Sequence, residues 1–153
     1  MFVTTINIDD DVQFEDIAYN GTTYIAVGNP VDSTSALRYV AISTDFESWI
    51  VKDIIEELSI EINEYDNYFT DIRYQGKYWY ILITGLNKLI YSLNDGVNWH
   101  LMTIDDITSE TPMQNEFITL GEKYSAILLR DSNSILYGNH ECSKIHIMQS
   151  KNN

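Results

Sequence analysis

The chain has 153 residues, enough for one domain with a buried core, and its 23 acidic residues against 9 basic ones give a formal net charge of −14. Direct binding of nucleic acid or of an anionic membrane needs clustered Lys and Arg, so this balance argues against both as partners. The start, "MFVTTINIDDD", lacks the basic and apolar segments of a signal peptide, no run has the length and apolar character to span a bilayer, and the single cysteine precludes an internal disulfide. We therefore expect a single cytoplasmic domain over residues 1–153.

Short, alternating segments rich in β-branched and aromatic residues predict an all-β chain. They occur at 23–28, 38–43, 78–84, 88–93 and 123–129, bounded by Gly, Asn, Asp or Ser. Between the second and third of these, residues 53–65 place Ile54, Ile55, Leu58 and Ile62 at helical spacing, although residues 58–65 also alternate. The sequence therefore predicts one short helical turn in this segment and strands elsewhere.

The chain also contains an internal repeat. "FEDIAYNG" at 14–21 and "FTDIRYQG" at 69–76 share the pattern Phe, x, Asp, Ile, x, Tyr, x, Gly, and a strand follows each. The matched pairs are Phe14 and Phe69, Asp16 and Asp71, Ile17 and Ile72, Tyr19 and Tyr74, and Gly21 and Gly76. A third unit at 116–138 keeps a glycine, Gly121, and a pair of strands. The three units span approximately residues 12–54, 67–104 and 115–148.

Units of about four antiparallel strands at a period of about 50 residues are typical of β-propeller blades. Closed propellers have about four to eight blades, so three blades leave an open arc, a ring completed by a second subunit, or a collapsed sandwich or barrel. An open arc would expose apolar blade faces to water. We therefore predict an all-β fold of antiparallel meander blades, a partial propeller of about three blades that a homodimer completes to six.

Each of the first two units ends in a turn rich in Ser, Asp, Asn and Trp. "STDFESW" contains Ser43, Asp45 and Trp49, and "SLNDGVNW" contains Ser92, Asn94, Asp95, Gly96 and Trp99. Asp and Asn side chains accept hydrogen bonds from the backbone two residues on, glycine adopts φ above zero, and tryptophan offers a large apolar area to the next strand. We predict structural rather than catalytic roles for all eight residues.

These turns resemble the Asp-box of the bacterial neuraminidase (BNR) repeat family of β-propellers, whose turn reads Ser/Thr-x-Asp-x-Gly-x-Thr-Trp. Ser92, Gly96 and Trp99 match that pattern, Asn94 stands where the family has Asp, and Asp95 is a candidate to supply the displaced acid. The first copy keeps Ser, Asp and Trp but is one residue shorter and has no glycine. The resemblance implies a turn at the blade periphery, in which the acid accepts turn hydrogen bonds and the tryptophan packs between strands.

A sialidase would be the expected enzyme of this family, with three arginines that grip a carboxylate. The three arginines here, Arg38, Arg73 and Arg130, occupy different positions in their units, so we interpret them as partners in structural salt bridges. His140, Cys142 and His146 match no strong zinc spacing. We therefore expect no enzymatic activity, no metal and no cofactor.

Aromatic and acidic side chains remain as candidates for binding. Tyr78 and Tyr80 alternate with Trp79 and so share one side of a predicted strand. The candidate binding residues are Tyr74, Tyr78, Tyr80, Glu56, Glu57, Glu61 and Glu64. They favour a non-enzymatic protein-interaction module that binds a basic surface, for example a phage-type (viral) inhibitor of a host nucleic-acid-binding complex. A carbohydrate- or receptor-binding propeller domain is the alternative, and a sialidase-like glycosidase remnant is the third hypothesis.

Overall fold

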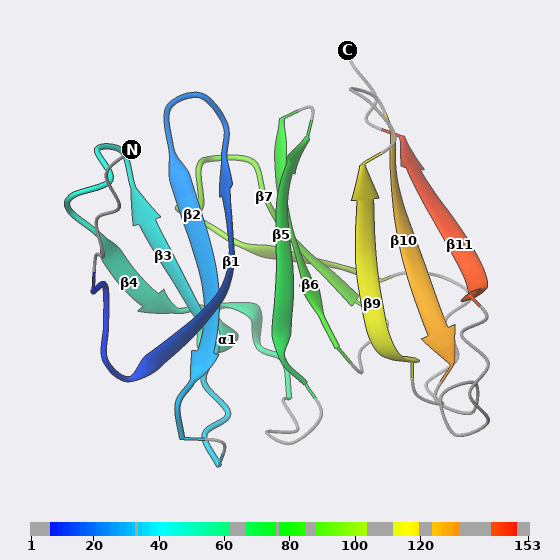
Figure 1. Ribbon diagram of the computed structural model, residues 1–153, viewed down its shortest axis with the longest axis horizontal. Coiled ribbons are helices and arrows are strands. Elements are labelled where there is room, and N and C mark those ends of the chain that lie inside the picture. Colours follow the sequence, from blue (N-terminus) through cyan, green and yellow to red (C-terminus); the bar gives the residue numbers. More distant parts are fainter. Residues whose placement is uncertain are drawn as a thin grey trace, which may run out of the picture.

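The computed structural model describes the backbone of residues 7–32, 34–61, 67–75, 77–84, 88–103, 112–119, 124–131 and 142–149, and side chains in the first five of these ranges up to Met102. Within them the chain is all-β, as predicted, and a single short helix, α1 (Ile55–Leu58), interrupts the strands (Figure 1). This helix is the one turn predicted within 53–65. No helix in the described ranges has the length and apolar character needed to cross a membrane.

The strands form three antiparallel sheets that follow one another along the chain (Figure 1). Sheet A contains β1 (Val12–Tyr19), β2 (Tyr24–Pro30), β3 (Tyr39–Ser43) and β4 (Ile50–Asp53). Sheet B contains β5 (Phe69–Gln75), β6 (Tyr78–Ile83), β7 (Lys88–Ser92) and β8 (His100–Thr103). Sheet C contains β9 (Pro112–Thr119), β10 (Tyr124–Asp131) and β11 (Cys142–Gln149). Within each sheet every strand pairs with the next along the chain, which makes three meanders, and sheet B lies between the other two.

Sheets A and B share the same backbone irregularity. β1 shifts register against β2 between Phe14 and Asp16, and β5 shifts against β6 between Phe69 and Asp71. A β-bulge places an extra residue in one strand at a specific point, and the sequence alignment matches these same residues. The repeat in the sequence therefore extends to the backbone of the first two sheets.

The core of the described residues lies between sheets A and B. Alternation along the strands sends Ile25, Val27 and Val40 to one face of sheet A, where they pack against Ile81 and Ile90 of sheet B. The cluster comprises Ile25, Val27, Val40, Ile54, Leu58, Phe69, Ile72, Trp79, Ile81, Ile83, Ile90 and Trp99. Leu58 of α1 belongs to this cluster, so the helical turn that follows β4 packs against the core.

Two side chains of sheet A also bind the backbone of β5. Asn29 Nδ2 donates to Phe69 O (2.9 Å), and Asn29 Oδ1 accepts from Phe69 N (2.8 Å). Asp16 Oδ2 accepts from Ile72 N (3.0 Å) and from Arg73 Nη1 (2.8 Å). β5 is an edge strand of sheet B, so these side chains satisfy backbone groups that strand pairing leaves open.

Candidate functional site

Hydrogen bonds to Ser43 and Asp45 build the turn after β3. Ser43 Oγ accepts from the N–H groups of Asp45 (3.3 Å) and Phe46 (2.9 Å). Asp45 Oδ1 accepts from the N–H groups of Ser48 and Glu47, each at 2.8 Å. The N–H groups of Ser48 and Glu47, followed by the Ser43 hydroxyl, lower the pKa of Asp45 from 3.8 to about 2. This carboxylate therefore stays ionised and is occupied by its own turn.

Asn94 takes the corresponding position in the turn after β7. Ser92 Oγ accepts from the N–H groups of Asn94 (3.4 Å) and Gly96 (3.1 Å), and Asn94 Oδ1 accepts from Asn98 N (3.0 Å). The amide oxygen of Asn94 replaces the carboxylate oxygen of Asp45 because both residues lie two positions after the serine. The expectation that Asp95 supplies the displaced acid is wrong. The backbone of Asp95 does shape the turn, with φ of +52° followed by +77° at Gly96.

The Asp95 carboxylate instead links sheet B to sheet A. Its Oδ1 accepts from Asn20 Nδ2 (2.7 Å), in the turn between β1 and β2, and from Trp79 Nε1 (3.1 Å). Asn20 is held in place because its own Oδ1 accepts from the N–H groups of Thr22 (2.9 Å) and Thr23 (2.7 Å). One carboxylate oxygen therefore joins two turns that are distant in the sequence.

The two turn tryptophans lie in different surroundings. Trp99 is 3% exposed, belongs to the core, and donates its backbone N–H to Glu57 Oε1 (2.6 Å). Trp49 is half-buried, and its ring meets Phe46 edge-on at 5.5 Å between centroids. The difference follows from the neighbouring sheets, since the Trp99 end of sheet B packs on sheet A.

The candidate tyrosines are divided between the two faces of sheet B. Tyr74 is 37% exposed and its ring lies against Trp79, a member of the core between sheets A and B. Tyr78 and Tyr80 stack at 5.6 Å on the opposite face, where Tyr80 is only 8% exposed. Burial, followed by the charges of Tyr78 and Tyr91, raises the pKa of Tyr80 to about 12. The structure therefore does not gather the three rings into one accessible surface.

The candidate glutamates of the described chain lie on and after α1. They are Glu56, Glu57 and Glu61, all exposed. Glu57 is nevertheless engaged, because Oε1 accepts from Trp99 N and Oε2 lies 3.4 Å from Lys52 Nζ. Glu57 therefore fastens the helical turn to the second Asp-box-like turn. Glu64 lies outside the described residues.

The described arginines make internal contacts. Arg38 is 0% exposed, and its guanidinium donates to backbone carbonyl oxygens 2.5 to 3.0 Å away. Arg73 Nη1 lies 2.8 Å from carboxylate oxygens of both Asp16 and Asp71, the type of salt bridge expected from the sequence. The side chain of Arg130 lies outside the described residues. Neither Arg38 nor Arg73 is placed to grip a ligand carboxylate.

No group of three or more His, Cys, Asp or Glu side chains that could hold a metal occurs among the side chains described up to Met102. Cys142 and His146 lie in β11, where only the backbone is described, and His140 lies outside the described residues. The interpretation that these residues bind no metal stays a prediction.

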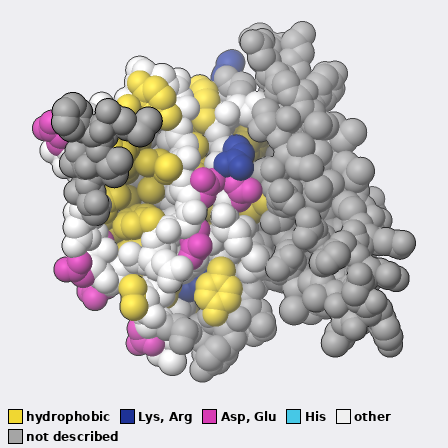
Figure 2. Space-filling model, in the orientation of Figure 1, with side chains coloured by type: hydrophobic (Ala, Val, Ile, Leu, Met, Phe, Trp, Pro, Cys, Tyr) yellow, Lys and Arg dark blue, Asp and Glu magenta, His cyan; other side chains and the backbone are white. Residues whose placement is uncertain are grey.

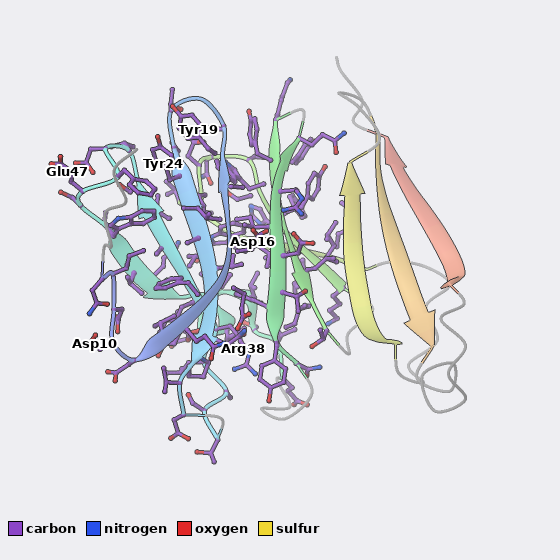
Figure 3. The ribbon with its side chains drawn as sticks, viewed as in Figure 1. Asp10, Asp16, Tyr19, Tyr24, Arg38 and Glu47 are labelled. Carbon is purple, nitrogen blue, oxygen red and sulfur yellow. The ribbon has the colours of Figure 1, made fainter. Side chains whose placement is uncertain are left out.

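The structure also contains an acidic surface that the sequence pattern did not single out. Its members, here called the acidic end, are Asp9, Asp10, Asp11 and Asp32. The N–H of Val31 donates to Asp11 O (2.9 Å), which joins the segment before β1 to the loop after β2. None of the four pairs with a Lys or Arg within the described side chains, and Figure 2 shows acidic side chains at the left and lower margins of sheet A. Burial, then the charges of Asp53, Asp9 and Asp11, raises the pKa of the nearby Tyr39. Figure 3 labels Asp10 at this end.

Sequence reasoning also missed an aromatic and apolar surface on sheet A. This outer face, turned away from sheet B, consists of Ile17, Tyr19, Tyr24, Ala26, Ala41, Phe46, Trp49 and Val51. Tyr19 is 51% exposed and stacks on Tyr24 at 4.2 Å, and Tyr24 meets Phe46 edge-on at 4.9 Å. Apolar side chains are visible over sheet A in Figure 2, and Tyr19 and Tyr24 are labelled in Figure 3. Alternation in β1 and β2 was the signal that could have identified this face.

No known protein-family model matches the chain, and no curated protein is significantly similar to it. The resemblance to Asp-box repeats therefore depends on the two turns alone.

Proposed function

We propose that this chain is a non-enzymatic protein-binding module, and that its acidic end binds a basic surface of a cytoplasmic partner protein. The observation that carries the proposal is the clustering of Asp9, Asp10, Asp11 and Asp32 with no described basic side chain paired to them. Like charges held close together repel one another, so a cationic surface that neutralises them gains both affinity and association rate.

The two carboxylates whose pKa values are shifted, Asp32 and Asp45, are not suited to act as general acids. The pKa of Asp32 is lowered by the N–H and the hydroxyl of Thr34, and that of Asp45 is lowered by its turn. A general acid that works near neutral pH needs a shift in the opposite direction. Protein surfaces that hold DNA or RNA are rich in Lys and Arg, so we propose a nucleic-acid-binding protein as the partner and competition with its nucleic acid as the effect.

The test uses two variants of equal net charge. One changes Asp9, Asp10 and Asp11 to Asn, which removes three charges from the acidic end and keeps an oxygen that can accept the Asp11 N–H. The other changes three exposed glutamates outside the acidic end, Glu47, Glu56 and Glu61, to Gln, and it tests at the same time whether the sequence-predicted candidates Glu56 and Glu61 contribute to binding. Each carries −14 + 3 = −11. Immobilised wild-type chain and variants are incubated with nuclease-treated lysate at low and high salt, with and without duplex DNA, and captured proteins are identified by mass spectrometry.

We expect wild type and the Gln variant to capture the same nucleic-acid-binding proteins, and the Asn variant to capture roughly tenfold less, because exposed ion pairs contribute about 0.2–1 kcal/mol each. High salt and duplex DNA should each release the captured proteins. Equal capture by the two variants, or capture that salt and DNA leave unchanged, would contradict binding through the acidic end.

A carbohydrate-binding module is the second candidate, because the exposed ring of Tyr19 is backed by Tyr24 on one side and offers its other side to a sugar. Binding of this kind depends on ring stacking and should hardly change with ionic strength. A glycan array probed with wild type and with Tyr19→Ala separates the two candidates. Loss of a glycan signal in the variant, at low and high salt alike, would favour the carbohydrate candidate.

A further inference from the structure

The outer face of sheet A matches, position by position, the face of sheet B that is buried against sheet A. The matched positions are Ile17 and Ile72, Tyr24 and Trp79, Ala26 and Ile81, and Ala41 and Ile90. Ala26 pairs with Ala41 in register as Ile81 pairs with Ile90. The four positions of sheet B are 0% exposed. On sheet A, Ile17 is 46% exposed and Tyr24 is half-buried, whereas the small side chains of Ala26 and Ala41 are 3% and 0% exposed. The outer face therefore has the same register and the same kind of apolar residues as a face that a neighbouring sheet covers.

Two specific contacts between sheets A and B also have their counterparts on the outer face. The N–H of Ile72 is satisfied by the Asp16 carboxylate of the preceding sheet, and the matching group on the outer face is the N–H of Ile17. In the turns, Phe46 corresponds to Asp95, and the two share a positive φ of +65° and +52°. Asp95 binds the preceding sheet, whereas Phe46 is 42% exposed.

We propose that a second copy of this chain covers the outer face of sheet A with its sheet C. Glu116 pairs with Leu128 in the register that pairs Asp16 with Val27, so β9 carries a carboxylate residue at the Asp16 position. The register of sheet C places Ile118, Ala126 and Ile147 in one cross-strand row, at the positions of Ala18, Ile25 and Ile42 in sheet A. It places Glu116, Leu128 and Ile145 in another row, at the positions of Asp16, Val27 and Val40. Apart from the glutamate these residue types are apolar, and they match the uncharged outer face.

The number of sheets and the charge both favour a closed pair. Two copies supply 2 × 3 = 6 sheets, within the range of about four to eight that closes a propeller, whereas three copies would supply nine. Two chains that each carry −14 repel one another, which favours contact through surfaces that lack charge. The eight residues of the outer face include no Asp, Glu, Lys or Arg and none of the four residues of the acidic end, although Asp53 borders this face beside Tyr39. The inference therefore does not depend on the proposed function.

Light scattering coupled to size-exclusion chromatography tests the inference at about micromolar to hundred-micromolar concentrations. The variant Ile17→Asp places a charge on an exposed position of the outer face, and Val97→Asp places one on a more exposed apolar position in the sheet B turn, 64% exposed, as the matched control. Hydrogen exchange of the β1 amides, followed against protein concentration, gives a second measurement on the wild-type chain.

We expect twice the single-chain mass for wild type and for Val97→Asp, and single-chain mass for Ile17→Asp with unchanged circular dichroism. A buried unpaired charge should raise the dissociation constant by at least about 100-fold. The β1 amides of wild type should gain protection as concentration rises. A wild-type chain that stays monomeric would overturn the inference, and so would an Ile17→Asp dimer of wild-type affinity. If Ile17→Asp does not fold, the wild-type chain decides: hydrogen exchange of its β1 amides that does not change with protein concentration would overturn the inference.

Discussion

Replacement of Gly96 by alanine should destabilise the protein more than the same change at Gly21, the exposed glycine in the turn between β1 and β2. Gly96 has φ of +77°, and a Cβ there would lie 2.8 Å from Ile42 Cδ1 and 2.9 Å from Ile25 Cδ1. Both methyl groups belong to sheet A, so the turn of sheet B lies directly against its neighbour at this residue. Ile25 is 0% exposed and sits in the core, which leaves its methyl group little room to move.

Gly21 provides a matched control for the backbone contribution. It has φ of +103° with no atom within 4 Å of the added Cβ, so Gly21→Ala introduces backbone strain without a clash. A left-handed conformation costs an alanine about 1–2 kcal/mol, and overpacking of a core costs about 1–3 kcal/mol more. We therefore expect losses of about 1–2 kcal/mol for Gly21→Ala and about 2–5 kcal/mol for Gly96→Ala.

Urea unfolding followed by tryptophan fluorescence measures both losses, provided that the slope of the transition is the same in all variants. A third variant, Ile42→Val, removes the Cδ1 atom that Gly96→Ala would meet. In that background Gly96→Ala should cost about 1 kcal/mol less than in wild type. If Gly96→Ala and Gly21→Ala destabilise equally, or the Ile42→Val background changes nothing, the turn does not pack on sheet A as described.

Three further substitutions test other contacts. Asn29→Ala should lower the free energy of unfolding by about 2–5 kcal/mol in urea titrations, because it leaves the buried N–H and C=O of Phe69 without partners, and a loss below about 1 kcal/mol would contradict that bridge. Asp45 has a folded-state pKa of about 2, lower than its usual 3.8, so its stabilisation is present above pH 4 and is lost as pH falls toward 2. The difference in stability between wild type and Asp45→Asn should therefore shrink over that range, and a constant difference would count against it. The pKa of Tyr80 is raised from 10.0 to about 12, so its contribution is complete below pH 10 and is lost as pH rises toward 12. Between pH 9 and about 11, the free energy of unfolding from urea titrations should therefore fall less for Tyr80→Phe than for wild type. An equal fall in both proteins would refute this.

Local structure was predictable because short-range patterns determine it. The strands and the helical turn at Ile55–Leu58 follow from spacing that extends over a few residues. The turn chemistry was predictable in kind, but the prediction that Asp95 supplies the displaced acid was wrong. The structure shows that the distance from the serine decides, since Asp45 and Asn94 each lie two residues after it.

Contacts between sheets were not predictable in the same way. Alternation placed Trp79 and Tyr80 on opposite faces and suggested that one face would be accessible. Both residues are buried, at 0% and 8% exposure, because sheet B is the middle sheet and has a neighbour on each side. Asn29 and Asp16 likewise bind backbone groups 40 and 56 residues away. A pattern within one strand carries no information about which sheet will lie opposite it.

The turn position shared by Phe46 and Asp95 shows how a neighbouring sheet acts on the sequence. A non-glycine residue at positive φ is strained by about 1–3 kcal/mol, and turn chemistry alone would favour Gly or Asn at this position. At Asp95 two hydrogen bonds offset the strain, one of them to Asn20 of the preceding sheet. At Phe46 the offset comes from ring contacts with Tyr24 and Trp49 on a face that no described sheet covers. The surroundings of the turn, rather than the turn alone, therefore decide which residue fits at this position, and Phe46 suits the apolar neighbour that the proposed second copy would supply.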